Sequence, residues 1–438
     1  MPRFRSRTVR AAAVTAAVTG LLVAAGGSGA AVARSAPAAR PHFAADCLHA
    51  PANCYAPGQF RVAYGIQPLL DHGIDGRGET VAVPEVATSR GEGGSDIRKD
   101  LAGFDATFGL PAARITVVNS VAHSASPWLA GGEEVEDTEI VHAVAPGARI
   151  RVVLFSGQAV ASAAGFTAAI ATFLKIGGTE GSVLSISASL GEHYFTKGEI
   201  SSIDAAARSA RARHVTVVAA SGDYGAVSDM NLGQTTPVKE VSLPASNPLV
   251  LAAGGTSLTA NRASGAYLRE KAWNTLPALP GGHSSASAGG FSTLYSRPSY
   301  QTGVPGSGST RGVPDVAGDA AFNTGMATFT AGPGGGVLLG ATGTSAAAPL
   351  WAGLIALADQ FAGHPLGFVN PAIYQIARGR AYHLAFHDVT TGNNTFELRK
   401  PPTTVRGYQA TPGWDPATGW GSPDAQYLVP LLALYASG

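Results

Sequence analysis

Ser345 is the residue with the clearest potential for chemistry in this sequence. It lies in GTSAAAP (343–349), directly before a run of small and apolar helix-forming residues. Ser and Thr are common at helix N-termini, where backbone N–H groups lack acceptors and the helix dipole is positive. A hydroxyl at such a point can attack an acyl carbon while an N–H group stabilises the developing anion. The alternative is an ordinary helix cap.

Two carboxylates could form a proton-transfer pair. Glu133 and Asp137 have three residues between them, so on a helix both would face the same side. Like charges at that spacing repel, and the pair must share a proton or remain solvated. A proton-sharing pair is a candidate acid–base group. The alternative is an acidic surface, which the neighbouring Glu134, Glu136 and Glu139 would favour.

Two further acids follow apolar strands. Asp223 comes directly after VVAASG (217–222), and Glu85 ends the apolar run AVP (82–84). The carboxyl ends of parallel strands are where α/β proteins bind ligands. We therefore expect Asp223 to lie near a site, although an Asp beside Gly222 also suits a simple turn.

The elements that must position these residues alternate along the chain. Short β-branched runs predict buried strands, and the segments between them predict helices. The strands are expected at 79–84, 149–155, 182–187 and 214–221, and the helices at about 132–144, 160–176 and 200–213. Such alternation predicts an α/β fold with a mainly parallel central sheet flanked by helices. Residues 230–340 are rich in Gly, Ser and Pro, which predicts loops and short strands.

The N-terminus predicts export. Residues 1–33 have four arginines, an apolar stretch and the small-residue site AVA (31–33), as in a signal peptide. The apolar stretch is too short to span a membrane. Removing these residues lowers Lys plus Arg from 30 to 26 against 29 acids, so the net charge changes from +1 to −3. We therefore expect a secreted protein that binds neither nucleic acid nor membrane, and nothing indicates an obligate oligomer, so we expect a monomer.

The two cysteines lie in an Ala- and Pro-rich stretch. Residues 34–58 predict an N-terminal arm or linker, and residues 59–438 predict a single domain. In an exported chain, Cys47 and Cys54 are expected to form a disulfide. Half of a metal site is the alternative, but no second Cys or His pair completes it.

Several motifs resemble those of one clan. GTSAAAP fits the nucleophile motif Gly-Thr-Ser-x-x-x-Pro of the subtilisins, but no His-Gly-Thr occurs anywhere. Glu85, Glu133 and Asp223 stand where a subtilisin has Asp, His and Asn. This pattern resembles the sedolisin family, the serine-carboxyl peptidases of the subtilisin clan. Further matches run from about residue 58 to 435: AYGI (63–66), VAPGARI (144–150), GGFSTLYSRPSYQ (289–301), RGVPDVAGDA (311–320), FHDVTTGNN (386–394) and YQATPGWDPATGWGSP (408–423).

The resemblance implies a subtilisin-like fold and a role for each acid. Ser345 would be the nucleophile and Glu133 the general base and then acid. Asp137 would hold Glu133 and share its proton. Asp223, protonated, would donate to the oxyanion, and Glu85 would support Glu133. The function implied is that of an acid-active endopeptidase acting on polypeptides, because a carboxylate can act as base where an unperturbed His is already protonated.

The resemblance also implies one structural calcium ion. Asp388 and Asp415 would supply carboxylates, and the carbonyls of Val389, Thr411 and Gly413 would join water in a six-oxygen shell. Thr411 stands where the family commonly has Gly. Asp residues that only cap loops are the alternative.

The chain also departs from the family pattern. Between the predicted signal and the first core strand lie only residues 34–78, so the long propeptide usual in the family is expected to be missing. Ala188 stands where relatives often have Trp, so the substrate preference cannot be carried over. Three other functions stay open: a tripeptidyl-peptidase, a hydrolase with a His base, and a secreted scaffold without catalysis.

Overall fold

The structure is a computed structural model, and the residues it describes form one compact unit. It describes residues 43–48, 54–87, 95–119, 129–130, 132–156, 162–179, 181–228, 238–277, 282–306, 308–332, 335–399 and 402–436. These residues belong to the compact unit Pro41–Gly438. The predicted signal peptide, residues 1–33, lies outside the described residues.

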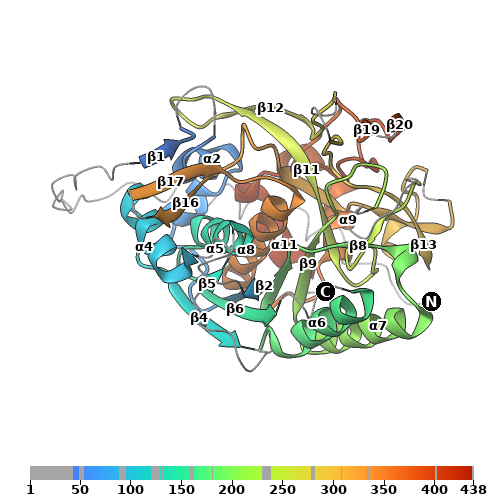
Figure 1. Cartoon of the computed structure of the whole chain (residues 1–438), viewed down its shortest axis with the longest axis horizontal. Coiled ribbons are helices and arrows are strands. Elements are labelled where there is room, and N and C mark those ends of the chain that lie inside the picture. The colour runs from blue at the N-terminus through green and yellow to red at the C-terminus, as the bar shows by residue number, and fades with distance from the viewer. Residues whose placement is uncertain are drawn as a thin grey trace, which may run out of the picture. The chain divides into compact units, whose positions relative to one another are not determined.

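A mainly parallel sheet forms the centre of this unit (Figure 1). Seven strands pair in parallel, in the order β4 (Arg114–Asn119), β6 (Arg149–Ser156), β2 (Thr80–Ala87), β7 (Val183–Ile186), β9 (Thr216–Ala220), β11 (Leu251–Ala260) and β15 (Val316–Asp319). Antiparallel strands are added by β5 (Leu129–Ala130), β3 (Ser95–Asp96) and β12 (Tyr267–Ala272). The expected α/β fold with a mainly parallel sheet is therefore confirmed.

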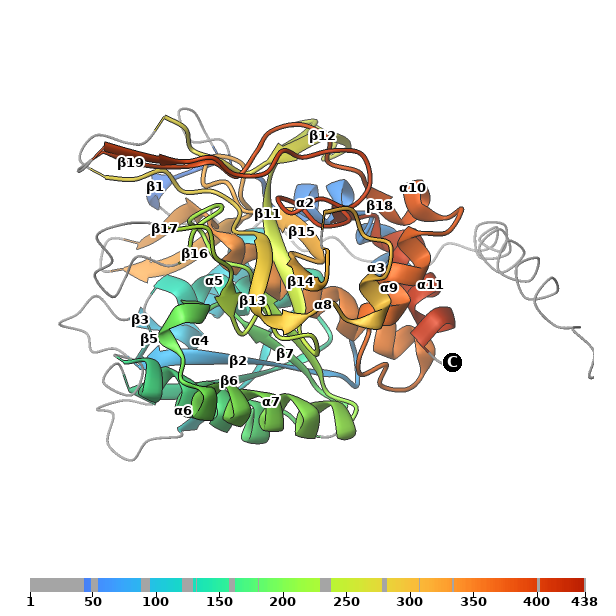
Figure 2. The same ribbon diagram turned by 90° about the vertical axis from the view of Figure 1, so that its right-hand side faces the viewer.

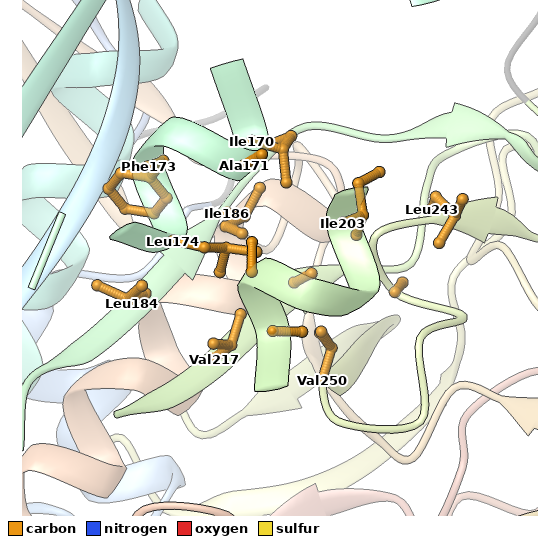
Figure 3. Packing of buried hydrophobic residues seen from close by; sticks show 14 of the residues in the cluster. Ile170, Ala171, Phe173, Leu174, Leu184, Ile186, Ile203, Val217, Leu243 and Val250 are labelled. Carbon is orange, nitrogen blue, oxygen red and sulfur yellow. The ribbon is translucent and has the colours of Figure 1, made fainter. Parts of the chain in front are cut away.

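Helices cover both faces of the sheet (Figure 2). On one face, α6 (Ala163–Ile176) and α7 (Lys197–Ala212) pack together over alternate side chains of the strands, including Leu184 and Ile186 of β7 (Figure 3). On the other face, α8 (Thr344–Ala362) contacts β7, β9, β11 and β15 and packs against α5 (Gly132–Val144). Its residues from Ala346 to Asp359 are all buried, as expected for a helix that is apolar all round.

The remaining elements are short and lie around this core. The helical ones are α2 (Pro57–Ala63), α3 (Gln67–Asp71), α4 (Ile97–Phe108), η3 (Glu192–Tyr194), η4 (Ser299–Gln301), α9 (Asn370–Ala377), α10 (Tyr382–Ala385) and α11 (Ala425–Ala436). The strands form pairs or a three-stranded sheet: β1 (Phe43–Asp46) with β17 (Gly335–Gly340) and β16 (Ala327–Gly332), β8 (Leu190–Gly191) with β10 (Ser242–Leu243), β13 (Gly290–Ser296) with β14 (Thr310–Val313), β18 (Phe386–His387) with β21 (Ser422–Pro423), and β19 (Phe396–Arg399) with β20 (Pro402–Val405).

Two sequence expectations differ from the structure. The segment expected as an N-terminal arm or linker contributes β1, which pairs in parallel with β17, and the Cys47–Cys54 disulfide forms as predicted. The region 230–340, expected to hold loops and short strands, contributes β11, which has ten residues and joins the central sheet. Its Gly254-Gly255 pair suggests a turn, but Ser287 and Trp273 pack where side chains at these positions would lie.

We expect the protein to lose stability as the pH rises from about 5 to 8. Burial raises the pKa of Asp319 to about 7 and that of Asp359 to about 8. An unfolded Asp titrates near pH 4, so above that pH only the folded chain keeps these protons, and the free energy of unfolding falls as the pH rises. The melting temperature measured from pH 4 to 8 checks this. Asp359→Asn, which can still accept from the Leu366 N–H, should flatten the decline, and an unchanged slope would contradict the assignment.

Candidate active site

A cavity of about 350 Å³ lies where β7 and β9 end and α8 begins. Three of the four predicted catalytic residues line it together: Glu133, Asp223 and Ser345. The other lining residues are Ser187, Ala188, Ser189, Ala220, Gly222, Tyr224, Ser285 and Thr344. None of these described lining residues is a histidine, so the chemistry of this cavity depends on carboxyl and hydroxyl groups.

Ser345 is the second residue of α8, not its cap. The helix begins at Thr344 and its N-cap is Gly343, which has a φ of 82°. The Ser345 N–H is therefore one of the first four amides of the helix, which have no acceptor within it. Gly343 is needed for a second reason, since a Cβ at this position would lie 2.7 Å from Asp223 Oδ2. The alternative interpretation of Ser345 as an ordinary helix cap is wrong, because Gly343 occupies the cap position and a side chain from elsewhere accepts from the helix N-terminus.

Asp223 is the residue that caps α8. Its Oδ1 accepts hydrogen bonds from the Thr344 N–H at 2.8 Å and from Thr344 Oγ1 at 2.9 Å. The Gly222 N–H in turn donates to Thr344 Oγ1 at 3.0 Å. Two donors at Oδ1 leave Oδ2 as the oxygen that can carry a proton. Asp223 can thus present an O–H group beside Ser345 when it is protonated.

Asp137 lies one helical turn beyond Glu133 and is fully buried, whereas Glu133 is exposed to the cavity. The Ser187 hydroxyl donates to Asp137 Oδ1 at 2.8 Å and lies 3.2 Å from the Ser345 carbonyl oxygen. That carbonyl lacks its usual helical donor because Pro349, four residues on, has no N–H. Ser187 therefore connects the acidic helix α5 to the turn that carries Ser345.

Glu136 has a part in the site that the sequence did not reveal. Both of its carboxylate oxygens accept from the Thr342 N–H, at 3.2 and 3.1 Å, in the loop that leads to Ser345. Burial, then the charges of Glu133 and Asp137, raise the pKa of Glu136 well above its usual value. The carboxyl group of Glu136 is therefore electrostatically linked to those of Glu133 and Asp137.

Glu85 lies on β2, where it is buried and pairs with Leu154 of β6. β2 contacts α5, the helix that carries Glu133 and Asp137. That Glu85 supports Glu133 stays a prediction.

Comparison with known proteins decides the family. Residues 122–379 match the Subtilase family, and this range contains Glu133, Asp137, Asp223 and Ser345. Kumamolisin from Bacillus sp. (strain MN-32) is 35% identical over 422 residues, covering 92% of this chain and 69% of the relative. The chain belongs to the sedolisin family of the subtilisin clan. It is accordingly a serine-type peptidase, a hydrolase whose substrates are polypeptides.

Other proteins of this family also match the chain. Sedolisin from Pseudomonas, a serine-carboxyl proteinase whose structure contains two molecules of pseudo-iodotyrostatin, has a TM-score of 0.72 and 27% identity over 86% of this chain and 97% of that one. Tripeptidyl-peptidase 1 of Bos taurus is 32% identical over 244 residues, or 51% of this chain and 38% of the relative. The fold expected from the sequence is thus found in a solved member of the family.

The residues predicted to bind calcium lie together near α10. Asp388 accepts from the Gly413 N–H with both oxygens, at 3.1 Å each. Asp415 accepts from the N–H groups of Thr411 and Ala417 and from both donors of Thr418. Asp415 therefore also caps its own turn.

Both carboxylates act electrostatically on one neighbouring hydroxyl. After burial, the charges of Asp388 and then Asp415 raise the pKa of Tyr382. Burial also raises the pKa of Asp415 to about 6. In the described part of the chain, no three His, Cys, Asp or Glu side chains are grouped to hold a metal. A calcium shell here would need the predicted backbone carbonyls and water in addition to the two carboxylates.

Proposed function

We propose that the chain is an acid-active serine-carboxyl endopeptidase that works as a secreted monomer. The observation that carries this proposal is the shared cavity of Glu133, Asp223 and Ser345 at the N-terminus of a buried helix. Among the described residues, no helix has both the length and the apolar character needed to cross a bilayer. The predicted signal peptide supports export.

Acylation would begin with Glu133 as the base. Its carboxylate takes the hydroxyl proton of Ser345 as Oγ forms a bond to the carbonyl carbon of the substrate. The carbonyl oxygen becomes an oxyanion, which accepts hydrogen bonds from the Ser345 N–H and from protonated Asp223. Glu133 then gives its proton to the leaving amine as the C–N bond breaks, and an ester on Ser345 remains.

Deacylation would use the same groups. Glu133 takes a proton from water as the water oxygen attacks the ester carbon. The second oxyanion is held as before, and its collapse breaks the bond to Ser345 Oγ, which recovers its proton from Glu133. Asp137 orients Glu133 from the next turn of α5 and shares its proton.

The proposal predicts activity at acid pH. Asp223 donates to the oxyanion only while it is protonated, and the two donors at its Oδ1 stabilise its charged form. Hydrolysis of unfolded protein measured from pH 3 to 8, with Ser345→Ala alongside, tests this. Activity confined to acid pH and absent in the variant is expected. A wild-type protein that is folded, supplied with calcium and inert at every pH would favour the scaffold.

Tripeptidyl-peptidase action is the second candidate, because relatives with that name match this chain. The products of a long peptide separate the two modes. Internal fragments from the start of the reaction indicate an endopeptidase, whereas successive tripeptides from the N-terminus indicate the other mode. The same products obtained after Glu133→Gln would instead favour a His base.

We also propose one structural calcium ion held by Asp388 and Asp415 with the carbonyls of Val389, Thr411 and Gly413. The ion would neutralise the half-buried carboxylate of Asp388 and the buried carboxylate of Asp415, and it would fix the loop after Thr411. Chelation should lower the melting temperature. If calcium was present at about 100 times its Kd, its removal should reduce the free energy of unfolding by about 2.7 kcal/mol. Asp388→Asn should remove most of this calcium effect. A melting temperature that is the same with calcium and with chelator would leave these acids as loop caps.

A further inference from the structure

A second cavity, of about 580 Å³, lies on the hairpin formed by β11 and β12. β12 lies at the edge of the sheet, at the top of both views (Figures 1 and 2). The lining residues are Ser257, Leu258, Thr259, Arg269, Glu270, Lys271, Trp273, Asn274, Thr275, Ala321, Phe322, Asn323, Thr324 and Thr391. This cavity is larger than the catalytic one, and the chemistry proposed above does not use it.

Two unpaired cations give this cavity its charge. Arg269 and Lys271 are exposed, and neither forms an ion pair within the part of the chain that the structure describes. They are two residues apart on β12, so both side chains project from the same face of the strand, about 7 Å apart. Opposite them on β11 are Thr259 and Ser257, which are uncharged.

The one acidic residue in the lining does not neutralise these cations. Glu270 points away from them because it lies between them on the strand, and it is 7% exposed. It accepts hydrogen bonds from Tyr64, Thr256 and Ser422 in the interior. Burial raises the pKa of Glu270, which further limits its negative charge.

One hydrogen-bonded pair of residues connects the linings of the two cavities. Thr275 lines the basic cavity and Ser285 lines the catalytic one. The Thr275 N–H donates to the Ser285 carbonyl at 2.8 Å, and the Ser285 N–H donates to Thr275 Oγ1 at 2.8 Å. Hydrogen-bonded segments lie about 5 Å apart, so one extended polypeptide can reach both cavities.

We propose that the basic cavity is an exosite that binds acidic side chains at alternate positions of an extended polypeptide substrate, beside the bond to be cut. In an extended chain, residues i and i+2 are also about 7 Å apart on one face, which matches the separation of Arg269 and Lys271. The inference rests on the proposed peptidase function. The chain's own N-terminal segment is not complementary, since residues 1–42 contain six arginines and no acid.

Two peptides that differ only in a flanking Glu-x-Glu or Gln-x-Gln test the exosite. At pH 5 and low salt, wild-type protein should cut the acidic peptide with a kcat/KM about three- to tenfold higher, mainly through KM, because exposed ion pairs are weak individually. Arg269→Gln with Lys271→Gln should remove this preference and leave cleavage of the neutral peptide unchanged. Lys197→Gln with Arg208→Gln, which removes two exposed cations from α7, is the matched control and should keep the preference.

Binding separates failure of the exosite from failure of the peptidase. The Ser345→Ala variant should bind the acidic peptide more tightly than the neutral one, and the difference should vanish at pH 3, where Glu is protonated, or at high salt. If neither peptide is cut but this difference is present, the exosite stands and the proposed function fails. Equal binding of both peptides, or a preference that survives the Arg269 and Lys271 substitutions, would overturn the exosite.

Discussion

Replacing Glu133 with Gln should lower kcat/KM by about 10⁴- to 10⁶-fold, as loss of a member of a catalytic group does in other serine peptidases. Gln keeps the size and hydrogen-bonding capacity of the side chain but cannot take the Ser345 proton. The variant should fold normally, because Glu133 is exposed to the cavity and not packed in the core. Initial rates on a chromogenic peptide at the acid optimum, with a melting curve for each variant, measure this.

Two further variants sharpen the expectation. Ser345→Ala should lose a similar factor, and Ser345→Ala combined with Glu133→Gln should lose no more than either alone, since residues that act as a unit are not additive. If the loss in kcat/KM of the double variant equals the product of the two single losses, the two residues act independently of each other.

Glu136→Gln is the matched control on the same helix. It makes the same chemical change at a carboxyl group that is one turn away and electrostatically linked to Glu133. Gln can still accept from the Thr342 N–H. The loss in kcat/KM should therefore stay within the range of one altered hydrogen bond, about tenfold or less. Equal losses at Glu133 and Glu136 would remove any reason to assign the base to Glu133.

The sheet could be predicted from the sequence because most of its strands can be recognised from their own residues alone. The runs that became β2, β6, β7 and β9 are continuous and β-branched, so they predict buried parallel strands without long-range information. β11 differs, because its Gly254-Gly255 pair has turn-like composition. Its strand conformation is set by the packing of Trp273 and Pro314 against it, and such contacts are not visible in a single sequence.

The candidate site residues could be named from the sequence, but the contacts that connect them could not. Glu133, Asp223 and Ser345 could be singled out because they end strands or begin a helix, or fit a family motif. Glu136 could not be separated from Glu134 and Glu139 by spacing alone, since each lies on the same helix. Its contact with Thr342 spans 206 positions, and only the fold brings the two together.

Substitution of Asp223 is expected to have the second largest effect on catalysis. Asp223→Ala removes a donor to the oxyanion and should lower kcat by about 10²- to 10³-fold, with KM little changed. It also removes the cap on the Thr344 N–H, which lowers stability by about 1 kcal/mol. A melting curve separates this small loss of stability from the loss of catalysis.

Asp223→Asn is the informative partner of that variant. The amide oxygen can still accept both hydrogen bonds from Thr344, and the amide N–H₂ can donate to the oxyanion at every pH. Wild-type Asp223 donates only while Oδ2 carries its proton, so the wild-type rate should fall with rising pH more steeply than the rate of Asp223→Asn. The wild-type kcat divided by the kcat of Asp223→Asn, followed from pH 3 to 7, should therefore decline. A constant ratio would mean that the Asp223 proton has no part in the reaction, and Asp223 would then act only as the cap of α8.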